Sequence, residues 1–130
     1  MEKDFDNWNK NKKIINKQSF VDFYHKREIW WCTLGVNIGF EQDGTGKNFD
    51  RPVIIIKGFS KNVFICLPLT GKKKNGKYYF YLGKINGRES TALLSQIRLV
   101  DTKRLIKKIG MLDQKLFDKL KTTLQKVIFN

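Results

Sequence analysis

Two residues at the ends of neighbouring apolar runs have side chains suited to binding an anion. Arg51 precedes Pro52 and the run VIII, and Thr70 ends the run VFICLPLT, just before a glycine and three lysines. A guanidinium is permanently charged and carries a planar fork of N–H donors, and a hydroxyl is a further donor. Each residue also has an ordinary explanation, since arginine is common at an exposed strand end and threonine before glycine is common in a turn. The two form a site only if the fold brings the strand ends together.

The surrounding charge favours a polyanionic partner. The 130 residues include 26 Lys and Arg against 12 Asp and Glu, a net charge of +14, which suits partners rich in phosphate or carboxylate. Residues 71–88 contain no acid, and their basic residues are Lys72, Lys73, Lys74, Lys77, Lys84 and Arg88. A nucleic acid and an acidic protein both fit this segment, which directly follows Thr70.

Other classes of site have little support in the sequence. Cys32 and Cys66 lie in apolar, strand-like runs without CxxC spacing, and His25 is the single histidine, so we expect no zinc site and no cofactor. No apolar run approaches the length of a membrane span, and the N-terminus lacks the apolar segment of a signal peptide. We therefore expect a protein of the reducing cytoplasm with no membrane contact, and buried thiols.

The elements that would position these residues are mostly short strands. Residues 8–27 favour a helix, and strands are predicted in REIWWCTLGV, RPVIII, NVFICLPLT, KYYFYL and TALLSQIRLVD, with RLIKKIGML able to extend the sheet. Pro52 lacks an N–H, which places Arg51 at the mouth of its strand. Asn75 and Gly76 are typical of a tight hairpin turn, and residues 37–50 of a mobile loop.

The C-terminal segment predicts a helix behind Asp113, whose carboxylate is suited to the N-cap. Short strands joined by tight turns and closed by one helix favour a small, strongly bent β-barrel with added helices, an α+β fold. We expect residues 1–26 to be an N-terminal helical extension and residues 27–130 to be the barrel domain.

Six segments, in order, give the chain a family resemblance: EIWWCTLG, GFEQ, RPVIII, LPLTGKK, LLSQIRLVDTKRL and IGMLDQKLFDKLKTTL. Together they resemble the PemK/MazF family of type II toxin–antitoxin ribonucleases, over roughly residues 27–128. The resemblance implies an SH3-like β-barrel that forms a homodimer. It also implies metal-independent cleavage of single-stranded RNA at short sequences, and a cognate antitoxin that blocks the toxin.

The resemblance also implies roles for particular residues. The family's catalytic arginine, threonine and loop glutamate correspond to Arg51, Thr70 and Glu41, and its strand glutamine corresponds to Gln96. Lys72 and Lys73, directly after Thr70, and Arg98 are expected to bind RNA through their charge. Attack of a ribose 2′-hydroxyl on the adjacent phosphate needs a proton acceptor and stabilisation of negative charge. Arg51 would hold the phosphate, Thr70 would donate a hydrogen bond and Glu41 would accept the proton. Phe40 stands where many members have serine, which removes one hydroxyl donor.

Two alternatives remain open on the sequence alone. A barrel with this charge can bind RNA or an acidic peptide without cleaving it, and a gyrase-directed toxin family shares the same barrel. The basic segment of residues 71–88 suits RNA better than a protein target. If the chain is a toxin, a cleft lined by Arg51, Lys72, Lys73 and Arg98 is a natural target for an acidic, disordered antitoxin segment.

Overall fold

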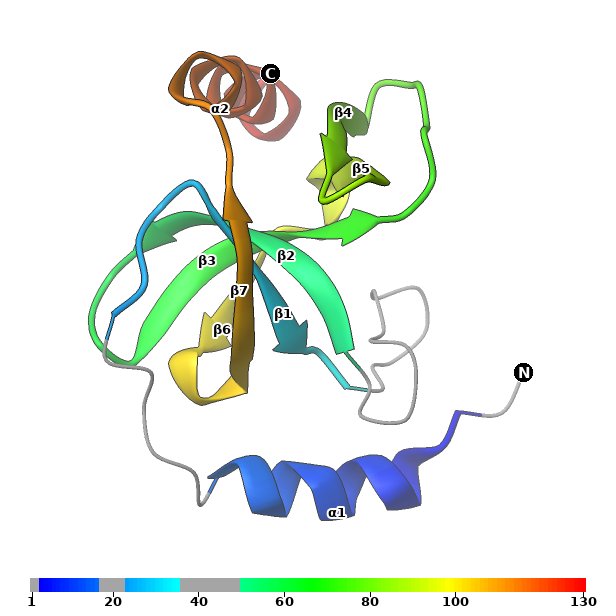
Figure 1. Cartoon of the computed structure of the whole chain (residues 1–130), viewed down its shortest axis with the longest axis vertical. Helices are drawn as coiled ribbons and strands as arrows, with labels where there is room; N and C mark the ends of the chain where they lie inside the picture. The colour runs from blue at the N-terminus through cyan, green and yellow to red at the C-terminus, as the bar shows by residue number, and fades with distance from the viewer. Residues whose placement is uncertain (1–2, 17–22, 36–49) are drawn as a thin grey trace.

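The strands form a curled antiparallel sheet between two helices (Figure 1). The computed structural model describes residues 3–16, 23–35 and 50–130. The elements of these residues are α1 (Phe5–Asn16), β1 (Glu28–Thr33), β2 (Asp50–Gly58), β3 (Val63–Thr70), β4 (Tyr79–Ile85), β5 (Arg88–Leu93), a 3₁₀ turn (Leu94–Gln96), β6 (Arg98–Asp101), a second 3₁₀ turn (Thr102–Arg104), β7 (Leu105–Met111) and α2 (Gln114–Phe129). The mainly β fold with N- and C-terminal helices confirms the predicted class.

The sheet is bent because β3 changes its neighbour along its length. Strands follow the order β4-β5-β3-β2-β1-β7, while β6 pairs with the first half of β3 and β5 with its last residues. Both faces of β2 are buried: Val53 and Ile55 pack inside the barrel, and Ile54 and Ile56 pack toward α2. This explains the continuous apolar run after Pro52, since a strand covered on both faces needs no polar alternation.

The two helices lie at opposite ends of the barrel (Figure 1). Helix α2 starts where the Asp113 carboxylate accepts hydrogen bonds from the backbone N–H groups of Lys115 and Leu116, at 3.1 and 3.3 Å, as predicted. It buries Phe117, Leu120 and Leu124 against the sheet. No helix of the described residues is both long and apolar enough to span a membrane.

Helix α1 packs on the barrel through Trp8, which is buried. Gly35 has a φ of +81°, and a Cβ there would lie 2.1 Å from the indole ring, so this close approach requires glycine. The Arg104 guanidinium lies 5.4 Å from the same ring and donates to the carbonyls of Thr33 and Leu34. The helix ends at Asn16, and residues 23–26 near the predicted end are not helical; there the Tyr24 ring packs against Phe64.

Two other local predictions were wrong. The two-residue hairpin turn forms at Asn86–Gly87, with φ of +50° and +77°, between the paired residues Ile85 and Arg88. The Asn75–Gly76 dipeptide lies instead in a longer connection, because β4 pairs with β5 and not with β3. The predicted strand TALLSQIRLVD is divided by the 3₁₀ turn of residues 94–96, where the chain leaves β5 for β6. The predicted loop of residues 37–50 falls almost wholly outside the described residues.

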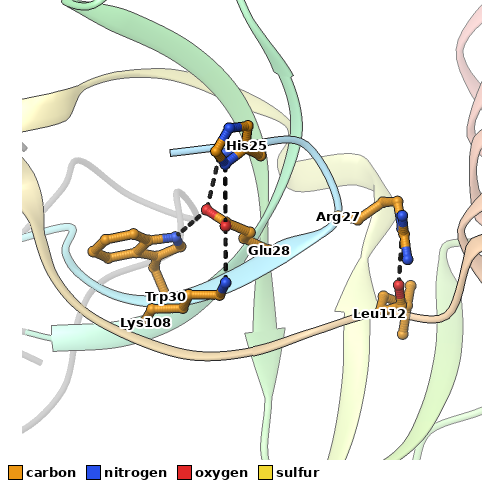
Figure 2. A network of polar contacts seen from close by, with 6 residues as sticks. All are labelled: His25, Arg27, Glu28, Trp30, Lys108 and Leu112. Carbon is orange, nitrogen blue, oxygen red and sulfur yellow. Dashed lines mark hydrogen bonds and ion pairs between the residues drawn. The ribbon is translucent and has the colours of Figure 1, made fainter. Parts of the chain in front are cut away.

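The start of β1 is fixed by a polar network (Figure 2). The buried Glu28 carboxylate accepts hydrogen bonds from Trp30 Nε1 at 3.0 Å and from the His25 backbone N–H at 2.8 Å, and it pairs with Lys108 Nζ at 3.0 Å. Burial raises the pKa of Glu28, but the hydrogen bonds from Trp30, Lys108 and His25 outweigh it, so the pKa lies below its ordinary value of 4.5. Arg27 Nε beside it donates to the Leu112 carbonyl at 3.0 Å, which joins β1 to the residue before α2.

Candidate functional site

The fold brings Arg51 and Thr70 to the same edge of the sheet. Strands β2 and β3 are antiparallel, and the register that pairs Val53 with Pro68 continues to place Arg51 level with Thr70. Arg51 Nη1 donates to the Leu69 carbonyl at 3.0 Å, which holds the guanidinium against the end of β3. Both residues are half-buried. The strand ends therefore meet, which is the condition for Arg51 and Thr70 to form one site.

Two clefts share Arg51 and Thr70. The first, here called the Trp31 cleft, has a volume of about 270 Å³ and is lined by Ile29, Trp31, Arg51, Pro52, Leu69, Thr70, Gly71, Ile85, Asn86, Arg88, Glu89, Ser90 and Ile109. The second, the Gln96 cleft, has a volume of about 280 Å³ and is lined by Arg51, Thr70, Lys74, Tyr79, Leu93, Ser95 and Gln96. If a phosphate of a nucleic acid binds at Arg51 and Thr70, the nucleotides on its two sides each have a cleft beside them.

The lysine-rich turn after Thr70 is held by Thr91, a fully buried residue of β5. Its Oγ1 donates to the Lys72 carbonyl at 2.7 Å and accepts from the Lys74 backbone N–H at 3.3 Å. Because Thr91 also pairs with Thr70 across the sheet, one buried hydroxyl fixes the course of the basic turn relative to the end of β3. The lysine backbone is therefore anchored beside the clefts, while the Lys72 and Lys73 side chains are exposed.

Tyrosine rings lie beneath the lysine ammonium groups of this turn. The distances from Nζ to ring centroid are 4.8 Å for Lys73 over Tyr81, 5.3 Å for Lys74 over Tyr79 and 5.5 Å for Lys77 over Tyr78. Exposed aromatic rings next to basic groups suit single-stranded nucleic acid, because rings stack on bases while the charges bind phosphates.

The other predicted site residues have different outcomes. Gln96 joins Arg51 and Thr70 in the Gln96 cleft. Lys72 and Lys73 lie beside the clefts but line neither, whereas their neighbour Lys74 does. Arg98 lies in β6 opposite Cys66, lines neither cleft, and is close enough to Arg104 for its charge to contribute to the lowered pKa of Arg104, after burial. Glu41 and Phe40 fall outside the described residues, so their roles stay predictions.

Several lining residues were not predicted from the sequence. Trp31, Asn86, Arg88 and Glu89 line one cleft because the β4–β5 hairpin pairs with β3 while its turn reaches β7, where Asn86 donates to the Ile109 carbonyl. The signal available for this hairpin was the second Asn-Gly dipeptide, which lies between two strand-like runs. Ser95 and Tyr79 enter the Gln96 cleft through the 3₁₀ turn and the start of β4.

The ionisable groups near the clefts divide by burial. Burial raises the pKa of Cys32 to about 12 and that of Cys66 well above its usual range, so both thiols stay protonated inside the barrel. Burial also raises the pKa of Asp50, although a 3.0 Å hydrogen bond from Thr33 opposes the shift. A hydrogen bond to the Glu89 carboxylate raises the pKa of Tyr81. The thiols thus have no role at the surface.

Comparisons with known proteins place the chain in a family. Residues 25–128 match the family described as the PemK-like, MazF-like toxin of type II toxin-antitoxin system. The endoribonuclease EndoA of Bacillus subtilis (strain 168) is 32% identical over 107 residues, which cover 75% of this chain and 88% of that protein.

Solved structures share the fold at low sequence identity. The crystal structure of MazF (Form-I) from Deinococcus radiodurans has a TM-score of 0.66 at 14% identity, over 85% of this chain and 98% of the other. An endoribonuclease in complex with its cognate antitoxin from mycobacterial species has a TM-score of 0.60 at 12% identity, over 82% and 95%. From the extent of the family match and the identity to its Bacillus relative, the chain belongs to the PemK-like, MazF-like toxins of type II toxin–antitoxin systems.

Proposed function

We propose that this toxin is an endoribonuclease that cleaves single-stranded RNA at the edge of the sheet where Arg51 meets Thr70. The observation that carries the proposal is their convergence at the junction of two clefts, beside the basic turn of residues 72–74. The family membership and the endoribonuclease named among the relatives support the same activity. The register of β2 and β3 brings any residues at these two positions together, and here they are a guanidinium and a hydroxyl, two donors suited to a phosphate.

The reaction is an attack of the ribose 2′-oxygen on the adjacent phosphorus. The bond from phosphorus to the 5′-oxygen breaks, which leaves a 2′,3′-cyclic phosphate on one product and a 5′-hydroxyl on the other. Arg51 stabilises the charge that develops on the phosphate oxygens, because its guanidinium stays protonated and is already held by the Leu69 carbonyl. Thr70 donates a hydrogen bond to the same oxygens. Glu41 accepts the proton of the 2′-hydroxyl, as the family resemblance implies, the leaving 5′-oxygen takes up a proton from water, and no step requires a metal.

The remaining predicted residues bind the rest of the strand. Gln96 contacts a nucleotide in the Gln96 cleft, together with Tyr79 and Lys74. Lys72 and Lys73 contact flanking phosphates, since their ammonium groups extend from an anchored backbone into solvent. Arg98 lines neither cleft, and its predicted RNA contact would require the strand to extend toward β6.

The toxin acts in the cytoplasm as a homodimer and is silenced by an acidic antitoxin. Among the family's solved relatives is an endoribonuclease in complex with its cognate antitoxin, which supports such a partner here. The antitoxin segment occupies the surface of Arg51, Lys72 and Lys73, so it competes with RNA. Residues 1–26 form an extension outside the barrel domain of residues 27–130.

The decisive experiment is cleavage of a mixed-sequence RNA by purified protein in EDTA, followed by mapping of both ends at each cut. We expect discrete cuts that leave cyclic phosphate and 5′-hydroxyl ends. Binding without cuts would favour a non-catalytic RNA-binding barrel, and neither binding nor cuts would favour a protein target. Loss of all cuts in EDTA, with recovery on adding a divalent cation, would contradict the metal-independent mechanism.

A further inference from the structure

One acidic residue lies in an otherwise basic cleft. Glu89 is in β5, opposite Lys84, and it is the single acid among the described residues that line the Trp31 cleft. The same cleft contains Arg51 and Arg88. A carboxylate at this position repels the phosphate that the two arginines attract. Glu89 can therefore favour RNA binding only by contacting another part of the nucleotide.

The Glu89 carboxylate is incompletely hydrogen-bonded. It accepts a hydrogen bond from Tyr81, whose ring also contacts the Lys73 ammonium at 4.8 Å. Its Oε2 atom, however, is buried and has no hydrogen-bond partner among the described residues. A buried acceptor without a donor is unfavourable by roughly 1–3 kcal/mol, and by more when it is charged. Such an atom is rare in native structures, and a donor supplied by a ligand would satisfy it.

The rest of the cleft suits a flat, partly apolar ring. Trp31 contributes an aromatic side chain to the lining, and Ile29, Ile85 and Ile109 contribute apolar ones. Asn86 is held in place because its Nδ2 donates to the Ile109 carbonyl at 3.1 Å. The volume of about 270 Å³ is just below the usual range of sites for small molecules, which fits one nucleobase better than a larger ligand. Aromatic stacking on a base is a common means of binding unstacked RNA.

We propose that the Trp31 cleft binds the base of a nucleotide next to the cleaved phosphate, and that the Glu89 carboxylate turns into the cleft to accept a hydrogen bond from the base's exocyclic amino group. This inference rests on the proposed RNA cleavage, and it adds a residue that determines sequence specificity. Cytosine, adenine and guanine carry such an amino group. Uracil does not, and its single ring N–H lies between two carbonyl oxygens that a carboxylate repels. The cleft therefore selects against uracil.

The test compares wild type with Glu89→Gln, which has nearly the same shape but presents an amide that both donates and accepts. Asp118→Asn is the matched control, because it removes the same charge from an exposed position on α2. The first measurement is the base frequency at each position around the cuts in a mixed-sequence RNA. We expect one position at which wild type and Asp118→Asn exclude uracil about tenfold or more, as a hydrogen bond to a charged group implies. Glu89→Gln should accept uracil there and keep its preferences elsewhere.

The second measurement does not depend on cleavage. Fluorescence anisotropy in EDTA compares an oligouridylate nonamer with the same oligomer carrying one central cytidine, because cytosine and uracil have rings of equal size. Wild type should bind the cytidine oligomer about tenfold more tightly, and Glu89→Gln less than twofold.

The outcomes separate the two proposals. Cleavage with identical base preferences in wild type and Glu89→Gln would overturn the role of Glu89 and leave the ribonuclease intact. Discrimination in binding without any cleavage would overturn the ribonuclease and leave the base site. Failure to bind either oligomer would overturn both. Thermal unfolding of each variant checks the fold, which we expect to be unaffected, since Glu89 Oε2 accepts no hydrogen bond from the described residues.

Discussion

Two regions of this toxin use the same three residue types for different purposes. The Glu28 network contains Trp30 and Glu28, and the neighbouring Arg27 binds Leu112 (Figure 2), whereas the Trp31 cleft combines Trp31, Arg51 and Glu89. The two tryptophans are consecutive, so the alternation of β1 sends them to opposite faces: Trp30 is buried and Trp31 is half-buried. In both regions an arginine donates to a main-chain carbonyl at 3.0 Å.

The regions differ in how completely the glutamate is satisfied. Glu28 has an indole, a backbone N–H and an ammonium group around it, and its partners all belong to the fold. Glu89 accepts a hydrogen bond from Tyr81, but its buried Oε2 has no donor among the described residues. A saturated carboxylate stabilises structure, whereas an unsaturated one beside a cleft has hydrogen-bonding capacity left for a ligand. The same residue type thus serves structure in one region and ligand binding in the other, depending on how much of its hydrogen-bonding capacity the fold already uses.

Alanine at the two arginines is the strongest test of this separation. We expect Arg51→Ala to reduce RNA cleavage by at least about 100-fold, because it removes the charge that stabilises the transition state, with little change in melting temperature. Arg27→Ala is the matched control: it loses a comparable hydrogen bond, to Leu112, and should cleave normally while its unfolding free energy falls by about 1 kcal/mol. Parallel single-turnover kinetics and thermal melts measure both. Equal cleavage by Arg51→Ala and wild type would remove Arg51 from the site.

Removing each carboxylate compares the glutamates directly. Glu28→Ala leaves Trp30 Nε1 and the His25 N–H without their acceptor, and we expect a loss of roughly 2–3 kcal/mol in unfolding free energy. Glu89→Ala should change stability little, because the loss of the hydrogen bond from Tyr81 is offset by removal of Oε2, which has no donor among the described residues. Urea denaturation measures both values. A larger loss for Glu89 than for Glu28 would show that Glu89 also serves the fold.

The pH dependence of stability adds a smaller test. The pKa of Glu28 in the folded protein lies below its ordinary value of 4.5, so its stabilisation is complete above about that pH and is lost as the pH falls through the folded-state pKa. Glu28→Gln lacks this contribution. The difference in melting temperature between wild type and Glu28→Gln should therefore shrink on acidification below pH 4.5. Taking the difference cancels Asp50, whose raised pKa acts with the opposite sign in both proteins. A difference that stays constant with pH would contradict the network's role.

The local sequence was enough to predict the positions of residues that lie at the end of a strand or at the start of a helix. Arg51 and Thr70 follow from Pro52 and from the end of an apolar run, and the Asp113 cap follows from its helix. Both Asn-Gly dipeptides give the same hairpin signal, yet the tight turn forms at Asn86–Gly87. Pairing of β3 with β5 decided this, and pairing between distant strands is not encoded in a short window.

Glu89 shows why the rest of the site could not be predicted. In the sequence it is an ordinary polar residue between Arg88 and Ser90 at the start of a strand. Its significance depends on the Trp31 cleft, which forms only when β5 pairs with β3 and the hairpin turn reaches β7, and on one oxygen that has no donor among the described residues. Arg98 illustrates the opposite case, because its sequence position near Gln96 suggested the site while the 3₁₀ turn directs it to β6.

The smallest expected effect concerns Lys72 and Lys73, which belong neither to the Glu28 network nor to the lining of the Trp31 cleft. Lys72 and Lys73 extend from a backbone that Thr91 anchors, and Lys73 also stacks on Tyr81. If both bind phosphates, Lys72→Glu/Lys73→Glu should weaken RNA binding and reduce the slope of log affinity against log salt by roughly 0.7 for each lost contact. Lys115→Glu/Lys119→Glu, on the exposed face of α2, changes net charge equally and serves as the control. Anisotropy titrations of a short RNA across a salt series measure the slope. The control alters only the overall electrostatic field of the protein, so equal slope changes in the two double variants would mean that Lys72 and Lys73 attract RNA only in a general way. A smaller slope in the Lys72→Glu/Lys73→Glu variant alone would place the RNA backbone along the turn that leads out of both clefts.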